Sequence, residues 1–183
     1  MKRVVVTGMA GITSLGSDWN TISGNFAANR SGIRRMDEWD RFEELNTRLA
    51  GPVDDFAVPA NWTRKQLRSM GRVSRMAVAS AQEALRDAGL LDDPSIRDGR
   101  MGVACGSSTG STDEIKAFGN MLLNSVAEGL NANSYVRMMP HTTAANISIF
   151  FGLTGRLIPT SSACTSGSQG IGYAYEAVSY THL

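Results

Sequence analysis

The stretch Leu157–Gly172, LIPTSSACTSGSQGIG, carries the clearest indication of the fold. It opens with apolar residues, places Cys164 among small hydroxyl residues, and continues with glycines at every second or third position. The apolar start predicts a buried strand, although Pro159 is an unusual residue for a strand interior. The glycine-rich continuation predicts a helix that other backbone approaches closely. The stretch therefore indicates a strand that passes directly into a helix, with Cys164 at the junction.

The same alternation of strand and helix extends outward from this stretch. Short buried strands are predicted at 3–6, within 100–110 and at 156–163, and helices at 18–29, 63–90, 141–153 and 166–178. Ser17 or Asp18 is a suitable N-cap for the first helix, and Gly89 is a suitable stop for the second. Residues 30–61 mix glycine, proline and charges and are predicted to be mostly loop. This alternation predicts an α/β layered fold with a mainly parallel sheet.

The bulk properties are those of an ordinary globular protein. The 183 residues are 42% hydrophobic and 19% charged, and the net charge of +1 gives no general attraction to nucleic acid or to a membrane surface. No apolar run approaches the roughly 20 residues of a membrane span. Cys105 and Cys164 lie in no CxxC motif and form no disulfide framework. We therefore expect a cytoplasmic protein with reduced thiols.

Cys164 is the candidate nucleophile. A thiol at the start of a helix has its thiolate stabilised by the free N–H groups and the helix dipole, and the thiolate is the reactive form. Ala163, Ser166 and Ser168 leave room for an incoming acyl group, and a backbone N–H beside the sulfur is suited to stabilise an oxyanion. A buried structural cysteine is the alternative, because free cysteines are often buried. Cys105, in the middle of a predicted strand, fits that structural role better.

Several segments together resemble the β-ketoacyl-acyl-carrier-protein synthases, the condensing enzymes of fatty acid and polyketide synthesis. SSACTSGSQGIGYAYEAV resembles their active-site segment, and KRVVVTGMAGITSLG resembles their opening strand and turn. TRKQLRSMGRVSRMAVASAQEALRDAGL resembles their first long helical stretch, GVACGSSTGSTDE the loop near the acyl pocket, and MMPHTTAANISIFFGLTG the segment before the active-site strand. The resemblance covers residues 1–178 in the family's order.

The resemblance implies a thiolase-like fold in which this chain supplies the N-terminal half of a five-layered αβαβα architecture, usually found in dimers. It implies a β-ketoacyl synthase N-terminal domain at 1–178 and a non-matching tail at 179–183. It also implies that Cys164 accepts an acyl group, which then condenses with malonyl carrier protein as carbon dioxide is lost. No bound cofactor is implied, because the substrates are carried on the phosphopantetheine of acyl carrier protein.

The resemblance also assigns residues around the cysteine and on the surface. The implied acyl pocket comprises Gly106, Ser107, Ser108, Thr109 and Ala163. Arg64, Lys65, Arg68, Arg72 and Arg75 recur at helical spacing and predict a positive stripe, for which a solvated helix face is the alternative. The resemblance assigns Lys65 and Arg68 to docking of the acidic carrier protein, and the adjacent Arg64 is expected to assist them. Nucleic acid fits this stripe poorly, because no aromatic residues accompany it.

The resemblance implies two histidines and a lysine from a second half that would aid decarboxylation, and no residue here matches them. His141 is expected at a helix start in a capping or packing role, and His182 lies after the matching region. We therefore expect a truncated and inactive chain. The alternatives are a non-catalytic partner subunit like a chain-length factor, a thiolase acting on coenzyme A thioesters, and a dehydrogenase. The presence of Cys164 opposes the first, and Gly8 and Gly11 lack the GxGxxG spacing that the last requires.

Overall fold

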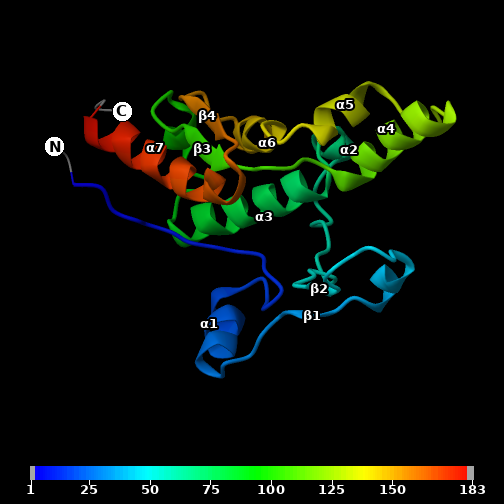
Figure 1. Ribbon diagram of the computed structural model, residues 1–183. Coiled ribbons are helices and arrows are strands. Elements are labelled where there is room, and N and C mark those ends of the chain that lie inside the picture. The colour runs from blue at the N-terminus through cyan, green and yellow to red at the C-terminus, as the bar shows by residue number, and fades with distance from the viewer. Residues whose placement is uncertain (1–2, 181–183) are drawn as a thin grey trace. The chain divides into compact units, whose positions relative to one another are not determined.

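The computed structural model describes residues 3–180. Backbone contacts divide the chain into a smaller unit, Met9–Ala57, and a larger unit that comprises the residues up to Gly8 and from Val58 onward. Each unit has its own helices and its own two-stranded sheet (Figure 1).

Residues 30–57 of the smaller unit are mostly loop, as predicted for residues 30–61. Its elements are α1 (Trp19–Ala27), β1 (Arg34–Arg35), the 3₁₀ helix η1 (Asp37–Arg41) and β2 (Leu49–Ala50). Strands β1 and β2 pair antiparallel. Asp18 caps α1 by accepting a hydrogen bond from the Thr21 N–H over 2.9 Å. Hydrogen bonding to the Thr21 side chain first, and then to its N–H, lowers the pKa of Asp18. The predicted helix start at this residue is confirmed.

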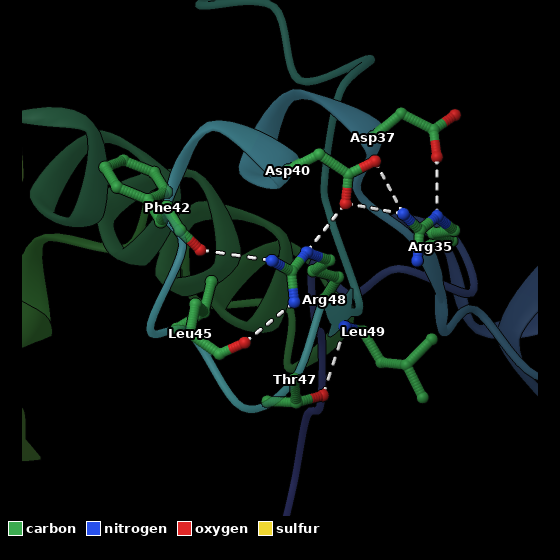
Figure 2. Close-up of polar contacts among 8 residues, drawn as sticks. All are labelled: Arg35, Asp37, Asp40, Phe42, Leu45, Thr47, Arg48 and Leu49. Carbon is green, nitrogen blue, oxygen red and sulfur yellow. Dashed lines mark hydrogen bonds and ion pairs between the residues drawn. The ribbon is translucent and has the colours of Figure 1, made fainter.

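An arginine closes the loop between η1 and β2 (Figure 2). Arg48 donates hydrogen bonds to the carbonyls of Leu45 at 2.8 Å and Phe42 at 3.1 Å, and its Nε lies 2.6 Å from Asp40. Arg35 contacts the same carboxylate, and its hydrogen bond is the main cause of the lowered pKa of Asp40. These hydrogen bonds and ion pairs connect η1 to the start of β2.

The larger unit carries most of the regular structure. Its elements are α2 (Arg64–Leu67), α3 (Arg72–Asp87), η2 (Pro94–Arg97), β3 (Val103–Gly106), α4 (Thr112–Asn124), α5 (Ala132–Met138), α6 (Thr142–Phe151), β4 (Leu157–Thr160), η3 (Ala163–Thr165) and α7 (Ser166–Tyr180). Both α6 and α7 contact β3 and β4, and α3 packs against α6 (Figure 1). The layering of helices on a parallel strand pair confirms the predicted α/β class.

The β3–β4 pair is parallel, and Cys105 lies opposite Pro159. The N–H of Val103 bonds to Arg156 O at 2.8 Å and that of Ser107 bonds to Thr160 O at 3.0 Å. These bonds show that the backbone N–H and C=O groups of residues 156, 158 and 160 point toward β3, while those of the odd-numbered residues point away from it. The backbone nitrogen of Pro159 therefore points away from this ladder, so the missing N–H breaks no bond and the proline is tolerated.

The core of the larger unit lies between α3 and α6. Its buried members are Trp62, Met70, Val78, Ile96 and Phe151. Trp62 also donates a hydrogen bond from its indole nitrogen to Gln82 Oε1 at 3.2 Å, which satisfies the polar atom of an otherwise apolar side chain. This core fixes α3 and α6, and through α6 it supports the β3–β4 pair.

The prediction of a buried strand at residues 3–6 is wrong. These residues join neither sheet among the described part of the chain, and Val5 and Val6 are 58% and 77% exposed. Immediately afterwards Gly8 packs against α3, where an added Cβ would lie 2.3 Å from Ala84 O and 2.7 Å from Ala88 N. The segment therefore leads onto the surface of α3. Within the described residues it has no neighbouring strand to pair with through backbone hydrogen bonds, as a strand requires.

The long helix predicted at 63–90 is divided into α2 and α3. Gly71 has an extended backbone and forms the N-cap of α3, and an added Cβ would lie 2.6 Å from Ser111 Cβ. Close packing of the chain before α4 thus selects glycine at this position, where glycine is also a suitable N-cap. The predicted stop is confirmed, because Gly89 adopts a φ of +71° just after α3. In the described residues, no helix is long and apolar enough to cross a membrane.

Candidate functional site

Cys164 is exposed on the turn that connects β4 to α7. It is the middle residue of η3, one short turn before the first residue of α7. The sequence predicted a junction of this kind, and the structure adds that a separate 3₁₀ turn carries the cysteine. The Cys164 thiol is therefore accessible to a substrate, and the backbone that carries it leads directly into the first turn of α7.

The residue before the cysteine has a strained backbone. Ala163 adopts a φ of +51°, a left-handed conformation that costs a residue with a Cβ about 1–2 kcal/mol. Its carbonyl accepts hydrogen bonds from Ser108 Oγ at 2.8 Å and Ser166 Oγ at 2.7 Å. Ser166 Oγ also accepts a hydrogen bond from the Ser162 N–H at 2.9 Å. These contacts hold the backbone of the strained turn, and so they fix the position from which the Cys164 side chain extends.

The other side of the turn is closed by its own hydroxyl groups. Thr165 Oγ1 donates to Ser162 O at 2.8 Å, and Ser162 Oγ donates to Gln169 Oε1 at 2.7 Å. The serine and threonine hydroxyls around the cysteine thus have a structural role, because they add hydrogen bonds within the turn and from the turn to α7. Gln169 was not predicted from the sequence, since a glutamine on an exposed helix face gives no distinctive pattern.

The start of α7 lies directly against the end of β3. An added Cβ on Gly106 would lie 2.1 Å from Ser166 O and 2.6 Å from Gly167 N. Gly170 continues this contact, with its added Cβ 3.3 Å from Gly106 N. The close approach predicted for the glycines of this helix is therefore present at Gly170. It is absent at Gly167 and Gly172, where an added Cβ meets nothing within 4 Å in the described chain.

The structure brings together part of the predicted pocket. Gly106 packs on the start of α7, and Ser108 bonds to Ala163, so three of the five predicted residues surround the cysteine turn. Ser107 and Thr109 bond instead to each other, with Ser107 Oγ donating to Thr109 O at 3.0 Å. These two residues shape the loop that presents Ser108.

Cys105 differs from Cys164 in its surroundings. It is half-buried on β3, and burial raises the pKa of its thiol above the ordinary value. A raised pKa leaves less thiolate at neutral pH, and the thiolate is the nucleophile. The prediction of a structural role for Cys105 agrees with this position.

The predicted positive stripe is only partly present. Arg64, Lys65 and Arg68 are exposed on and just after α2. The chain then bends before α3, and Arg75 is half-buried with its Nε donating to Met70 O at 3.2 Å. The expectation of one continuous helical stripe is therefore wrong, because the helix break separates its two ends.

His141 lies at the start of α6 and not on the cysteine turn. His141 is exposed at the N-cap position of α6, where its side chain makes no capping bond and its carbonyl accepts from the Ala145 N–H. His182 and most of the predicted tail at 179–183 lie outside the described residues. Over residues 3–180, no group of three or more His, Cys, Asp or Glu is arranged to hold a metal ion.

Comparison with known proteins gives a consistent family. Residues 1–182 match the family model for the β-ketoacyl synthase N-terminal domain. A 3-oxoacyl-[acyl-carrier-protein] synthase 2 from Vibrio harveyi is 32% identical over 98% of this chain. The enzyme of the same name from Staphylococcus aureus strain COL is 29% identical over 97% of it. This chain spans 43% and 42% of those relatives, less than half of their length.

Solved structures agree on the fold. A β-ketoacyl synthase from Burkholderia phymatum STM815 is 59% identical, with a TM-score of 0.92 over 97% of this chain and 44% of its own. The ishigamide ketosynthase/chain length factor is 24% identical, with a TM-score of 0.77 over 100% of this chain and 45% of its own. At that identity the second likeness concerns the fold alone. The thiolase-like arrangement expected for an N-terminal half is confirmed.

Proposed function

The chain belongs to the β-ketoacyl synthase family, and on this basis we propose that Cys164 is the nucleophile of an acyltransferase that acts on acyl thioesters. The observation that carries the proposal is the exposed thiol on a strained turn between β4 and α7. Such strain is commonly retained at functional sites, where it fixes the geometry of a reacting group. The hydrogen bonds from Ser108 and Ser166 to Ala163 supply the support that holds it.

In the first step the Cys164 thiolate attacks the carbonyl carbon of the acyl thioester. A new C–S bond forms, the carbonyl oxygen becomes an oxyanion, and a backbone N–H at the start of α7 is suited to stabilise it. The oxyanion then collapses, the original C–S bond breaks, and the carrier thiol leaves after taking up a proton. The product of this step is acyl-Cys164.

In the second step we propose a decarboxylative Claisen condensation. Malonyl carrier protein loses carbon dioxide, and the resulting carbanion attacks the acyl carbon, so that a C–C bond forms and the Cys164 thiolate is released. The groups that the family resemblance assigns to decarboxylation match no residue here. For these 183 residues alone we therefore expect acylation of Cys164 without the β-ketoacyl product.

We propose acyl carrier protein as the partner and Arg64, Lys65 and Arg68 as its docking residues. The names of the related synthases specify this carrier, and one structure with the same fold holds a type II PKS acyl-carrier protein in complex with its ketosynthase. Exposed cations on α2 suit an acidic protein surface. A homodimer, a cytoplasmic location and the absence of a bound cofactor belong to the same proposal.

The test uses the two cysteines as internal controls. The chain is incubated with an acyl carrier protein thioester or with the matching acyl coenzyme A, and the acylated peptide is identified by mass spectrometry. We expect the acyl mass on Cys164 in wild type and in Cys105→Ala, and no acyl mass in Cys164→Ala. Acylation of Cys105 instead would overturn the assignment, and acylation by coenzyme A alone would favour the thiolase alternative.

A further inference from the structure

The bend between α2 and α3 is held by side chains from three different helices. Each binds one of three consecutive carbonyls: Arg137 of α5 binds Arg68 O, Asn146 of α6 binds Ser69 O, and Arg75 of α3 binds Met70 O. Arg137 makes two of these bonds, from Nε at 3.0 Å and from Nη2 at 2.7 Å. Carbonyls left free by a helix break need partners. Arg137 and Asn146 supply two of them from 69 and 77 residues away, and Arg75 supplies the third from the adjoining helix.

Arg137 is itself fixed in place. Its Nη1 lies 3.1 Å from Glu114 Oε1 on α4, and the two side chains are only 24% and 13% exposed. The Arg137 carbonyl also accepts a hydrogen bond from the Ser111 N–H at 2.8 Å. A guanidinium with three bonds in a planar fork is strongly oriented, so it transmits the position of α4 and α5 to the carbonyl of Arg68.

Helix α2 depends on such external support because it has only four residues. A single helical turn is not stable by itself. At its start, Thr63 and Gln66 form a capping box. At its end, the contacts of Arg137 fix Arg68, which is one of the three exposed cations of this segment.

We propose that Arg137 is a positioning residue that fixes α2 and thereby orients Arg64, Lys65 and Arg68 for an acidic carrier protein. The inference rests on the proposed docking function. Holding the three cations in place before the partner arrives lowers the ordering cost of association. Arg137 does not act through its own charge, since that charge is largely covered and is paired with Glu114.

Four variants separate positioning from charge. Arg137→Met removes the bonds and one charge. Glu114→Gln combined with Arg137→Met removes the bonds but leaves the net charge as in wild type. Arg137→Lys keeps the positive charge, but an ammonium group cannot bond to Arg68 O and Glu114 in the planar geometry of a guanidinium. Arg86→Met is the control, which removes an exposed arginine at the C-terminal end of α3. Binding of purified holo acyl carrier protein is measured at low and high salt, and amide hydrogen exchange is measured at residues 68–72.

We expect Arg137→Met and the charge-neutral double variant both to bind the carrier protein about three- to tenfold more weakly at low salt. Both variants should also show faster amide hydrogen exchange at residues 68–72. Arg137→Lys should bind the carrier protein with an affinity between those of wild type and Arg137→Met. Arg86→Met should bind it like wild type. Wild-type affinity in the double variant would overturn the inference, and so would faster exchange with unchanged affinity. If the wild-type chain itself shows no salt-dependent binding, the docking function fails and the inference with it. The exchange data would still report whether Arg137 holds the bend.

Discussion

Ser108 Oγ donates a hydrogen bond to the carbonyl of Ala163 at 2.8 Å, across 55 residues of sequence. The bond joins the loop after β3 to the residue that precedes Cys164. It is shared with Ser166, whose hydroxyl donates to the same carbonyl at 2.7 Å and lies 3.1 Å from Ser108 Oγ. The turn that carries Cys164 is therefore positioned by the loop of the neighbouring strand as well as by its own helix.

Ser108→Ala is expected to slow acylation of Cys164 about three- to tenfold. One hydrogen bond of about 0.5–1.5 kcal/mol is lost, while the bond from Ser166 keeps the turn from collapsing. The measurement is the rate of acyl-enzyme formation by mass spectrometry. Ser23→Ala is the matched control, because Ser23 Oγ donates to Asn20 O within α1 of the smaller unit. Equal rates in the two variants would show that the Ser108 bond does not position the cysteine.

Gly106→Ala is expected to lower the free energy of unfolding by about 2–3 kcal/mol, because the new methyl group overlaps backbone. Its nearest atom would be Ser166 O at 2.1 Å, and helix backbone cannot move aside as a flexible side chain does. Gly167→Ala is the control, since nothing lies within 4 Å of its added Cβ. That helical substitution should raise stability by about 0.5–1 kcal/mol. Chemical denaturation of both variants checks the prediction, and a similar loss in both would contradict it.

Much of this arrangement could be predicted from sequence because it depends on local patterns. The apolar run at β4, the glycine-rich start of α7 and the cap at Asp18 were each identified from their own residues. The helix break at Gly71 was not, because its cause is close contact with Ser111, forty residues away. Arg137 was likewise not predicted, since its partners Arg68 and Glu114 are distant in sequence.

The missed elements have physical reasons of the same kind. Helices α4 and α5 were not predicted from the sequence. In the structure no residue of α4 is buried, and α5 buries only Ser134. Residues 3–6 looked like a strand because three valines favour extended backbone. A strand forms only where a hydrogen-bonding edge is available, and Gly8 directs this segment onto α3.

Neutralising two cations on α2 should weaken carrier-protein association, and more so at low salt. Lys65→Gln with Arg68→Gln removes exposed charges that attract an acidic partner, and salt screens such attraction over about 10 Å. The association rate at two salt concentrations is the measurement. Arg86→Gln, which removes an exposed charge at the other end of α3, should have little effect. An unchanged salt dependence in the Lys65 and Arg68 double variant would leave a solvated helix face as the explanation.

Alkylation should select Cys164 near neutral pH. Burial raises the pKa of Cys105, so at any pH below that value its thiolate fraction is smaller than for an ordinary cysteine. Iodoacetamide should therefore modify Cys105 only when the pH is raised into the alkaline range, where its thiolate forms. The site of iodoacetamide modification, followed by peptide mass spectrometry from pH 6 to pH 10, tests this. Labelling of Cys105 at neutral pH at the rate of Cys164 would contradict it.

The outward face of α7 should make the 183-residue chain self-associate. Ile171, Tyr175 and Val178 are 76%, 45% and 39% exposed, and their spacing of four and three residues places them on one stripe of the helix. An apolar stripe in water favours association, because contact between two such stripes removes apolar area from solvent. Light scattering after size-exclusion chromatography should show species larger than one chain.

Ile171→Lys should reduce this association by placing a charge in the middle of the stripe. The sheet-facing side of α7, where Gly170 lies close to β3, is unaffected, so acylation of Cys164 should persist. Leu123→Lys on α4 is the control, because Leu123 is 84% exposed and has the same apolar character. If both variants reduced association equally, general surface hydrophobicity would be the cause. A larger effect of Ile171→Lys would identify α7 as the face through which the chains meet.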